Sequence, residues 1–160
     1  MSGDASVASF TQTPADWSDA RRDALADAVR QHVRAFGIWK VASSGSSMEP
    51  TIPGGSLLEV EPLPEQLCVG DILAWVPGGR AAICCHRVIA VSASGAVLTR
   101  GDNRAAPDDC APPSRHVGVV RRYWVGGRSF GAGLQIRSST PSKYRRVRQR
   151  IRGWAERAIR

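Results

Sequence analysis

Hydrophobic positions along the chain follow two different periods, one helical and one typical of strands. In residues 13–37 a set of apolar side chains recurs at the spacing of one helical face: Leu25, Val29, Val33 and Phe36. Thr13, with Asp16 three residues later, resembles a capping box, and Pro14 suits a first helical turn. Gly37 is a natural stop. We therefore predict an amphipathic N-terminal helix that packs on the rest of the protein.

From Ile38 to about Arg137, short runs rich in Val, Ile and Trp alternate with Gly and Pro. This pattern is typical of short strands joined by turns. We expect strands near residues 38–42, 56–61, 71–76, 81–91, 96–100 and 117–125. Turn-forming residues at 77–79 and 92–95 predict two hairpins. The fold class predicted is mainly β, with one β-rich domain over residues 38–137 and an N-terminal extension, residues 1–37.

The sequence of the C-terminal part, residues 138–160, predicts a linker followed by an amphipathic helix rich in arginine. Its apolar face would consist of Tyr144, Val147, Ile151, Trp154 and Ala158. Of the net charge of +8, seven charges lie in residues 142–160, so the basic character belongs to this tail. Such a helix fits an anionic membrane surface. A solvated or body-packed helix and a contact with a partner remain alternatives, and nucleic acid is the less favoured partner.

Two sequence features bear on location and on metals. The chain has no run of 18 apolar residues and no signal-peptide pattern at its N-terminus, so we expect a cytoplasmic protein that contacts a membrane at most peripherally. Its cysteines, at 68, 84, 85 and 110, form no Cys-x-x-Cys pair and lack zinc-ligand spacing. We expect free thiols, mostly buried, and neither a metal nor a cofactor.

Candidate chemistry begins with the segment SGSSMEPTIPGGS, residues 44–56, because a serine becomes a nucleophile only beside a base. Among the histidines, His32 falls on the predicted helix and His116 opens a strand, so both favour structural roles. His86 lies within the strand segment CCHRVIAV. A third segment, VLTRGDNRAAPDD at residues 97–109, carries Asp102 within a Gly-Asp-Asn turn and two further aspartates after it.

In this order the three segments resemble the motifs of the signal peptidase family, over about residues 43–125. SGSSMEPTI resembles the box whose serine directly before Met attacks the peptide bond, and that serine is Ser47. CCHRVIAV resembles the box of the general base, where bacterial members carry lysine and the archaeal and endoplasmic-reticulum type carries histidine. LTRGDN with the following aspartate pair resembles the acidic box of that same type.

The resemblance implies a β-rich serine endopeptidase that processes a peptide or protein precursor. Ser47 would be the nucleophile and His86 the general base. Either Asp108 or Asp109 would orient the imidazole: spacing from the Gly-Asp-Asn turn favours the first, and alignment of the aspartate pair favours the second. Asp102 would hold the loop or assist.

Residues around the nucleophile would shape the substrate site. The resemblance implies shallow pockets for small residues, with Met48 in the wall and Pro50 stiffening the turn. Gly45 stands where the endoplasmic-reticulum type has a serine that adds an oxyanion donor, so the Ser47 N–H would carry this task. The larger departure from that family is that no membrane anchor is seen in the sequence, which leaves a secretory substrate open.

Two other functions are alternatives to this one. Self-cleaving SOS-type repressors combine a Ser-Met box with a lysine base, but they need a DNA-binding domain and a cleavable Ala-Gly site ahead of the serine. The 46 residues before Ser47 offer one helix and no such site. A non-catalytic module that binds peptides or membranes is the second alternative, and intact serine, histidine and acidic segments disfavour it.

Overall fold

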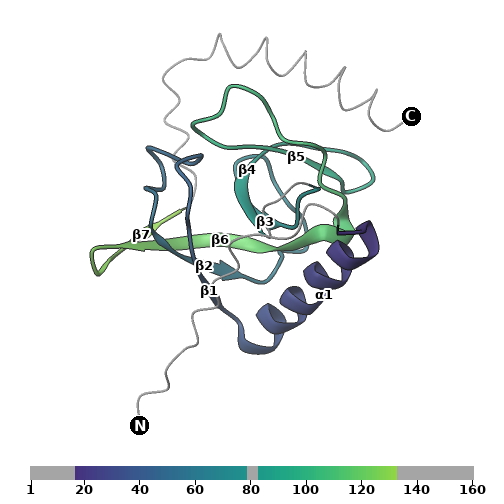
Figure 1. Ribbon diagram of the computed structural model, residues 1–160, viewed down its shortest axis with the longest axis horizontal. Coiled ribbons are helices and arrows are strands. Elements are labelled where there is room, and N and C mark those ends of the chain that lie inside the picture. The colour runs from purple at the N-terminus through teal and green to yellow at the C-terminus, as the bar shows by residue number, and fades with distance from the viewer. Residues whose placement is uncertain (1–16, 79–82, 133–160) are drawn as a thin grey trace.

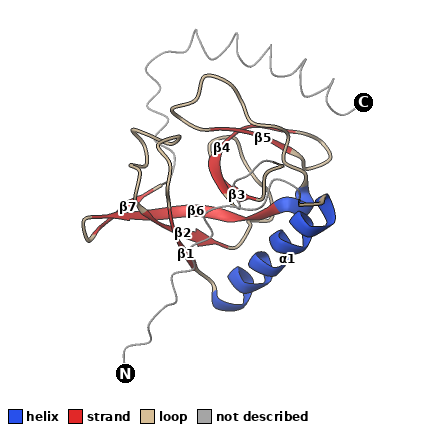
Figure 2. Ribbon diagram, viewed as in Figure 1, coloured by secondary structure: helices blue, strands red, loops and turns tan. Residues whose placement is uncertain are grey.

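The computed structural model describes residues 17–78 and 83–132. Its elements follow the chain as α1 (Asp19–Phe36), β1 (Trp39–Ala42), β2 (Leu57–Glu61), β3 (Ile72–Trp75), β4 (Cys84–Val91), β5 (Val97–Arg100), the 3₁₀ turn η1 (Pro113–Arg115), β6 (His116–Val125) and β7 (Arg128–Gly131). The fold is mainly β, with α1 lying across one side of the sheet, as the sequence predicted (Figure 1, Figure 2).

One antiparallel sheet contains all the described strands, in the order β1-β2-β6-β3-β4-β5, with β7 paired to β6. The six predicted strands are confirmed, and so is the turn at 92–95, closed by the Gly95 N–H on Ser92 O. Strands β3 and β4 pair as expected, although residues 79–82 of their connection lie outside the described part. Strand β7 was not predicted, because its four residues are all exposed and give no alternating pattern.

Helix α1 begins later than the capping box suggested. Its N-cap is Ser18, whose side chain accepts a hydrogen bond from the Arg21 N–H. Thr13, Pro14 and Asp16 lie outside the described residues. Gly37 ends the helix as predicted, with φ 78° and its N–H bonded to Val33 O.

The buried face of α1 is rotated from the predicted one. It consists of Arg22, Ala26, Val29 and Val33, whereas Phe36 is 72% exposed. The Arg22 guanidinium reaches Pro77 O at 3.0 Å, so a charged residue can occupy the face that packs on the sheet. Packing of the helix on the body is confirmed, and the expectation for Phe36 is wrong.

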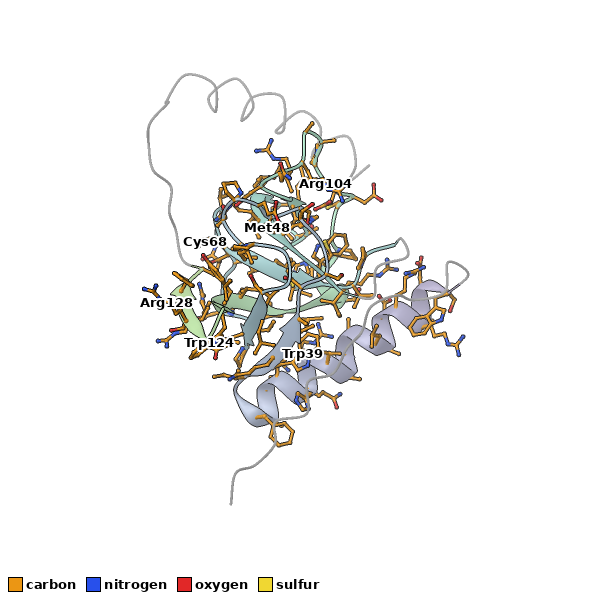
Figure 3. The ribbon with its side chains drawn as sticks, turned by 60° about the vertical axis from the view of Figure 1, so that its left-hand side comes forward. Trp39, Met48, Cys68, Arg104, Trp124 and Arg128 are labelled. Carbon is orange, nitrogen blue, oxygen red and sulfur yellow. The ribbon has the colours of Figure 1, made fainter. Side chains whose placement is uncertain are left out.

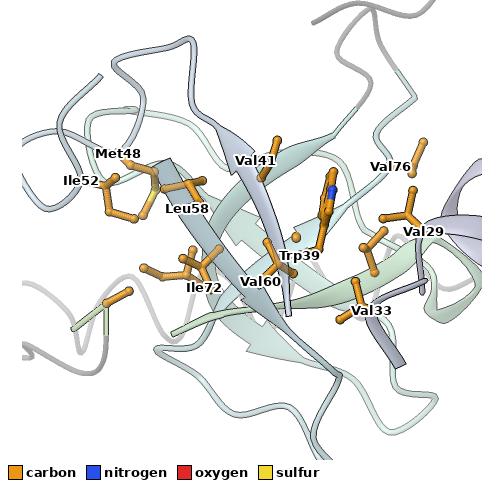
Figure 4. Packing of buried hydrophobic residues seen from close by; sticks show 14 of the residues in the cluster. Val29, Val33, Trp39, Val41, Met48, Ile52, Leu58, Val60, Ile72 and Val76 are labelled. Carbon is orange, nitrogen blue, oxygen red and sulfur yellow. The ribbon is translucent and has the colours of Figure 1, made fainter. Parts of the chain in front are cut away.

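The core has two parts, on the two faces of β3. Ile72 and Ala74 belong to a larger cluster that reaches α1, while Leu73 and Trp75 belong to a smaller one beneath β4 and β5. All four side chains are buried, because a strand with neighbours on both faces alternates between two cores. In the larger cluster, Met48 packs beside Ile52 and Leu58, at the end away from the helix (Figure 4).

Several further expectations can be compared with the described residues. The four thiols are free, as predicted. Cys68 is exposed and the other three cysteines are partly buried, so the expectation of mostly buried thiols is met only in part. The tail at 138–160, for which the sequence predicts a basic helix, lies outside the described residues. In the part of the chain that the structure describes, no helix has the length and hydrophobicity needed to cross a membrane.

Candidate active site

The candidate nucleophile lies in a loop, residues 43–56, whose two ends are tied together. The Ser43 N–H donates to Ser56 O at 2.8 Å, and the Gly55 N–H donates to Ser43 O at 3.2 Å. Inside the loop Met48 is buried in the larger core. This apolar anchor holds its neighbour Ser47 at the half-buried surface of the loop.

His86 connects this loop to a carboxylate. It lies in β4 opposite Leu73 of β3 and is 7% exposed. Its Nε2 is 2.8 Å from Ser47 Oγ, and its Nδ1 is 2.6 Å from Asp108 Oδ2. Both ring nitrogens of one imidazole are therefore held, one by a hydroxyl and the other by a carboxylate.

The structure separates the two neighbouring aspartates. Asp108 receives a second hydrogen bond, 2.7 Å from Thr99 Oγ1, and its main-chain N–H donates to Thr99 O. Asp109 is exposed. Of the two carboxylates that the sequence left open, Asp108 is the one that contacts His86.

Asp102 does not touch His86 but binds the neighbouring Arg87. The guanidinium donates to both carboxylate oxygens, at 2.8 and 2.6 Å, and Thr51 Oγ1 donates to the same carboxylate. Burial raises the pKa of Asp102, but the hydrogen bonds from Arg87 and Thr51 outweigh it and hold the pKa below its ordinary value. Asp102 thus links β4, the 43–56 loop and its own turn, which matches the loop-holding role expected for it.

The turn after β5 also holds the candidate nucleophile in place, by hydrogen bonds to main-chain carbonyls of the nucleophile loop. The Asn103 N–H donates to Ser47 O at 2.8 Å, and the Asn103 side chain donates to Ser46 O at 3.2 Å. Gly101 packs so closely here that a Cβ on it would lie 2.5 Å from Ser47 O and 3.1 Å from His86 Nε2. Only a residue without a side chain fits this position.

A pocket of about 230 Å³ adjoins Ser47 and His86. Gly45 and Met48 line it, as expected for substrate contacts, whereas Pro50 is exposed and is not among the lining residues. The other lining residues are Val41, Ala42, Ser43, Ser44, Ile52, Leu58, Ile83, Cys84, Cys85 and Arg104. Figure 3 shows Met48 and Arg104 in the upper part of the molecule, with Trp39 below them beside α1.

One lining residue has an unmatched polar atom. Ser43 Oγ is buried and has no hydrogen-bond partner among the described residues. Likewise, among these residues none accepts a hydrogen bond from the Ser47 main-chain N–H. A buried hydroxyl without a partner is costly, so both donors are candidates for a group that enters the pocket.

Two cysteines, Cys84 and Cys85, also line this pocket. Burial raises the pKa of the Cys85 thiol to about 12. Burial, together with nearby Cys85 and Asp108, also raises the pKa of the Cys84 thiol above its ordinary value. Both thiols are therefore protonated at neutral pH and are poor nucleophiles. Cys84 Sγ, a His86 ring nitrogen and an Asp108 carboxylate oxygen lie within 4.8 Å of one another.

The remaining histidines lie away from this site, as the sequence indicated. His32 is exposed on α1, and its ring lies 4.6 Å from that of Phe36. His116 opens β6, where it is buried and bonded through Nε2 to Ala111 O. Sequence reasoning missed Thr99, Gly101 and Ser43, although Thr99 and Gly101 stand within the acidic segment that it singled out.

Comparisons of the chain with protein-family models, with curated proteins and with solved structures gave no match.

Proposed function

We propose that this protein is a serine endopeptidase of the signal peptidase type, which cleaves a peptide or protein precursor, as in the processing of leader or signal peptides. The observation that carries the proposal is the chain of hydrogen bonds from Ser47 Oγ through His86 to Asp108. A nucleophile, a base and an orienting carboxylate in this sequence of contacts are what acyl transfer requires. The adjoining pocket offers a place for the substrate.

In the first half of the reaction, Ser47 Oγ attacks the carbonyl carbon of the scissile bond while His86 Nε2 takes its proton. The tetrahedral intermediate collapses when the C–N bond breaks and the leaving amine receives that proton from Nε2. An acyl-enzyme on Ser47 remains. Asp108, bonded to Nδ1, holds the ring in the tautomer that leaves Nε2 free to accept and stabilises the imidazolium.

In the second half, a water molecule gives a proton to His86 Nε2 and attacks the acyl carbonyl. His86 returns the proton to Ser47 Oγ as the ester C–O bond breaks, and the carboxylic acid product leaves. The state of the enzyme is then restored without a cofactor.

Oxyanion stabilisation falls to donors at the start of the loop. We assign it to the main-chain N–H of Ser47, because Gly45 supplies no side chain. The buried Ser43 hydroxyl lines the same pocket and has no partner among the described residues, so it is the candidate for a second donor to the substrate. Gly45 and Met48 line this pocket, and the shallow pockets that the resemblance implies would accept small substrate residues.

The cytoplasmic location, the peripheral contact of the 142–160 segment with anionic membranes, and the precursor substrate remain parts of this proposal. They rest on the charge pattern and on the resemblance of the motifs. The two alternatives, a self-cleaving regulator and a non-catalytic binding module, predict different outcomes in the experiment below.

The experiment incubates the purified protein with candidate precursors from its own genome and sequences the new termini. Cleavage in trans by the wild type, with loss of about 10⁴-fold or more in Ser47→Ala and in His86→Ala, is expected for a residue pair that acts as a unit. Ser44→Ala and His32→Gln are matched controls and should retain cleavage. Cleavage that survives in Ser47→Ala would disprove the assignment, and cleavage of the chain itself alone would favour the regulator.

A further inference from the structure

A second chemical feature coincides with the candidate active site. Cys84 and His86 stand two residues apart in β4, so both side chains point to the same face of the sheet. Cys84 packs there against the smaller core, whereas Cys85 packs against the larger one. Asp108 approaches this face from the loop after β5.

These three residues present donor atoms in a compact group. Cys84 Sγ, a His86 ring nitrogen and an Asp108 oxygen all lie within 4.8 Å of one another. Ligand atoms about 2.0–2.3 Å from a tetrahedral Zn²⁺ stand roughly 3–4 Å apart, so small side-chain movements would suffice. Because Cys84 and His86 also line the pocket, an ion has a route to them, and a water could fill a fourth position.

We propose that Cys84, His86 and Asp108 bind a thiophilic divalent cation, Zn²⁺ foremost, and that this binding switches the enzyme off. The switching part rests on the proposed peptidase function, whereas the binding part does not. Sulfur, imidazole and carboxylate ligands together favour Zn²⁺ over Mg²⁺ or Ca²⁺, which prefer sets made only of oxygen. On binding, the Cys84 thiol releases its proton to solvent.

Inhibition follows from the contacts of the imidazole. His86 Nδ1 is held by Asp108 and Nε2 by Ser47, so the ring has no spare nitrogen. A metal on either nitrogen displaces one of these partners and removes the lone pair or the orientation that proton transfer needs. The ion would thus act at the base itself, with Cys84 as the residue that makes the site selective for it.

The binding test titrates the full chain, free of any purification tag, with Zn²⁺ in a chelator competition assay. Every cysteine and histidine of the sequence lies in the described part, so no further thiol or imidazole ligand remains outside it. One equivalent should bind, with affinity at least tenfold lower in Cys84→Ser and in Asp108→Asn, and unchanged in the matched control Cys85→Ser. Co²⁺ substitution should give a thiolate-to-metal absorption band that Cys84→Ser lacks.

The activity test compares hydrolysis with and without Zn²⁺, each variant being referred to its own metal-free rate. The wild type and Cys85→Ser should be inhibited and recover with chelator, while Cys84→Ser should resist. Binding that is equal in the wild type and Cys84→Ser, or no binding at micromolar Zn²⁺, overturns the site. Binding without any peptidase activity in the metal-free protein supports the site and contradicts the proposed function instead.

Discussion

The main-chain N–H of Asn103 donates a 2.8 Å hydrogen bond to the carbonyl oxygen of Ser47. This bond joins the turn after β5 to the loop that carries the candidate nucleophile. The turn ends in the stretch that brings Asp108 to His86. The segment 101–108 therefore positions both ends of the Ser47–His86–Asp108 array. The geometry of the array depends on how closely this segment packs against the loop that carries Ser47.

The variant Gly101→Ala tests whether close packing of the turn after β5 against the Ser47 loop is needed for activity. A Cβ at Gly101 would meet Ser47 O at 2.5 Å and Arg104 Cγ at 2.9 Å, so the loop must shift. A displacement of about 1 Å at a catalytic group can cost 10²-fold in rate, and we expect kcat/KM to fall by about that much. Steady-state kinetics on a cleaved precursor measure the loss.

Gly131→Ala is the matched control, because a Cβ there meets nothing within 4 Å. It should change kcat/KM by less than twofold. Equal activity of Gly101→Ala and the wild type would show that the turn does not position the nucleophile.

Much of the array could be predicted from sequence, because Ser47, His86 and the acidic segment each carry a short local pattern. The sheet was predictable for a similar reason, since most of the side chains that β2, β3, β5 and β6 bury are apolar. The face of α1 was not, because a buried Arg22 depends on a carbonyl 55 residues away.

The choice between neighbouring aspartates was also beyond the sequence. Asp108 and Asp109 have the same chemistry, and the difference comes from Thr99, which meets Asp108 across the loop. Ser43 was not predicted, because a hydroxyl without a hydrogen-bond partner can be recognised only when the positions of all possible partners are known. Local sequence patterns predict which chemical groups the site contains, whereas tertiary contacts determine which of these groups touch one another.

Replacement of the two aspartates should separate their roles. Asp108→Asn keeps the shape of the side chain but removes the charge that holds the His86 tautomer, and we expect kcat to fall by about 10³–10⁴-fold. Asp109→Asn, at an exposed position, should remain within about twofold of the wild type. Parallel kcat measurements give the answer, and the reverse order would move the orienting role to Asp109.

Removal of the Ser43 hydroxyl should affect stability and activity in opposite directions. The hydroxyl is buried without a partner among the described residues, so Ser43→Ala should leave the free energy of unfolding unchanged or raise it by up to about 1 kcal/mol. If the hydroxyl donates to the substrate, kcat/KM should fall by about ten- to a hundredfold. Urea unfolding and kinetics measure the two effects.

Ser44→Ala provides the comparison for Ser43→Ala, since Ser44 is exposed and lines the same pocket. It should leave both quantities near their wild-type values. A Ser43→Ala variant that is less stable and fully active would assign this hydroxyl a purely structural role.

His116 should make the stability of the fold depend on pH. Burial lowers its pKa, the hydrogen bond to Ala111 O opposes this, and the charge of Arg30 lowers it further. The folded protein therefore binds fewer protons at this position than the unfolded chain, whose histidine titrates near ~6.5. Its contribution to stability is present above that pH and is lost as the pH falls, by at most about 1.4 kcal/mol per pH unit.

His116→Gln removes the titrating group while keeping a side-chain N–H for Ala111 O. Between pH 7 and pH 5 the wild type should lose more unfolding free energy than this variant, as measured by urea denaturation at each pH. His32→Gln, at an exposed site on α1, should follow the wild-type curve. Because the wild type and His116→Gln differ at this residue alone, the difference between their curves isolates His116. Parallel curves for these two proteins would contradict its burial as a neutral ring.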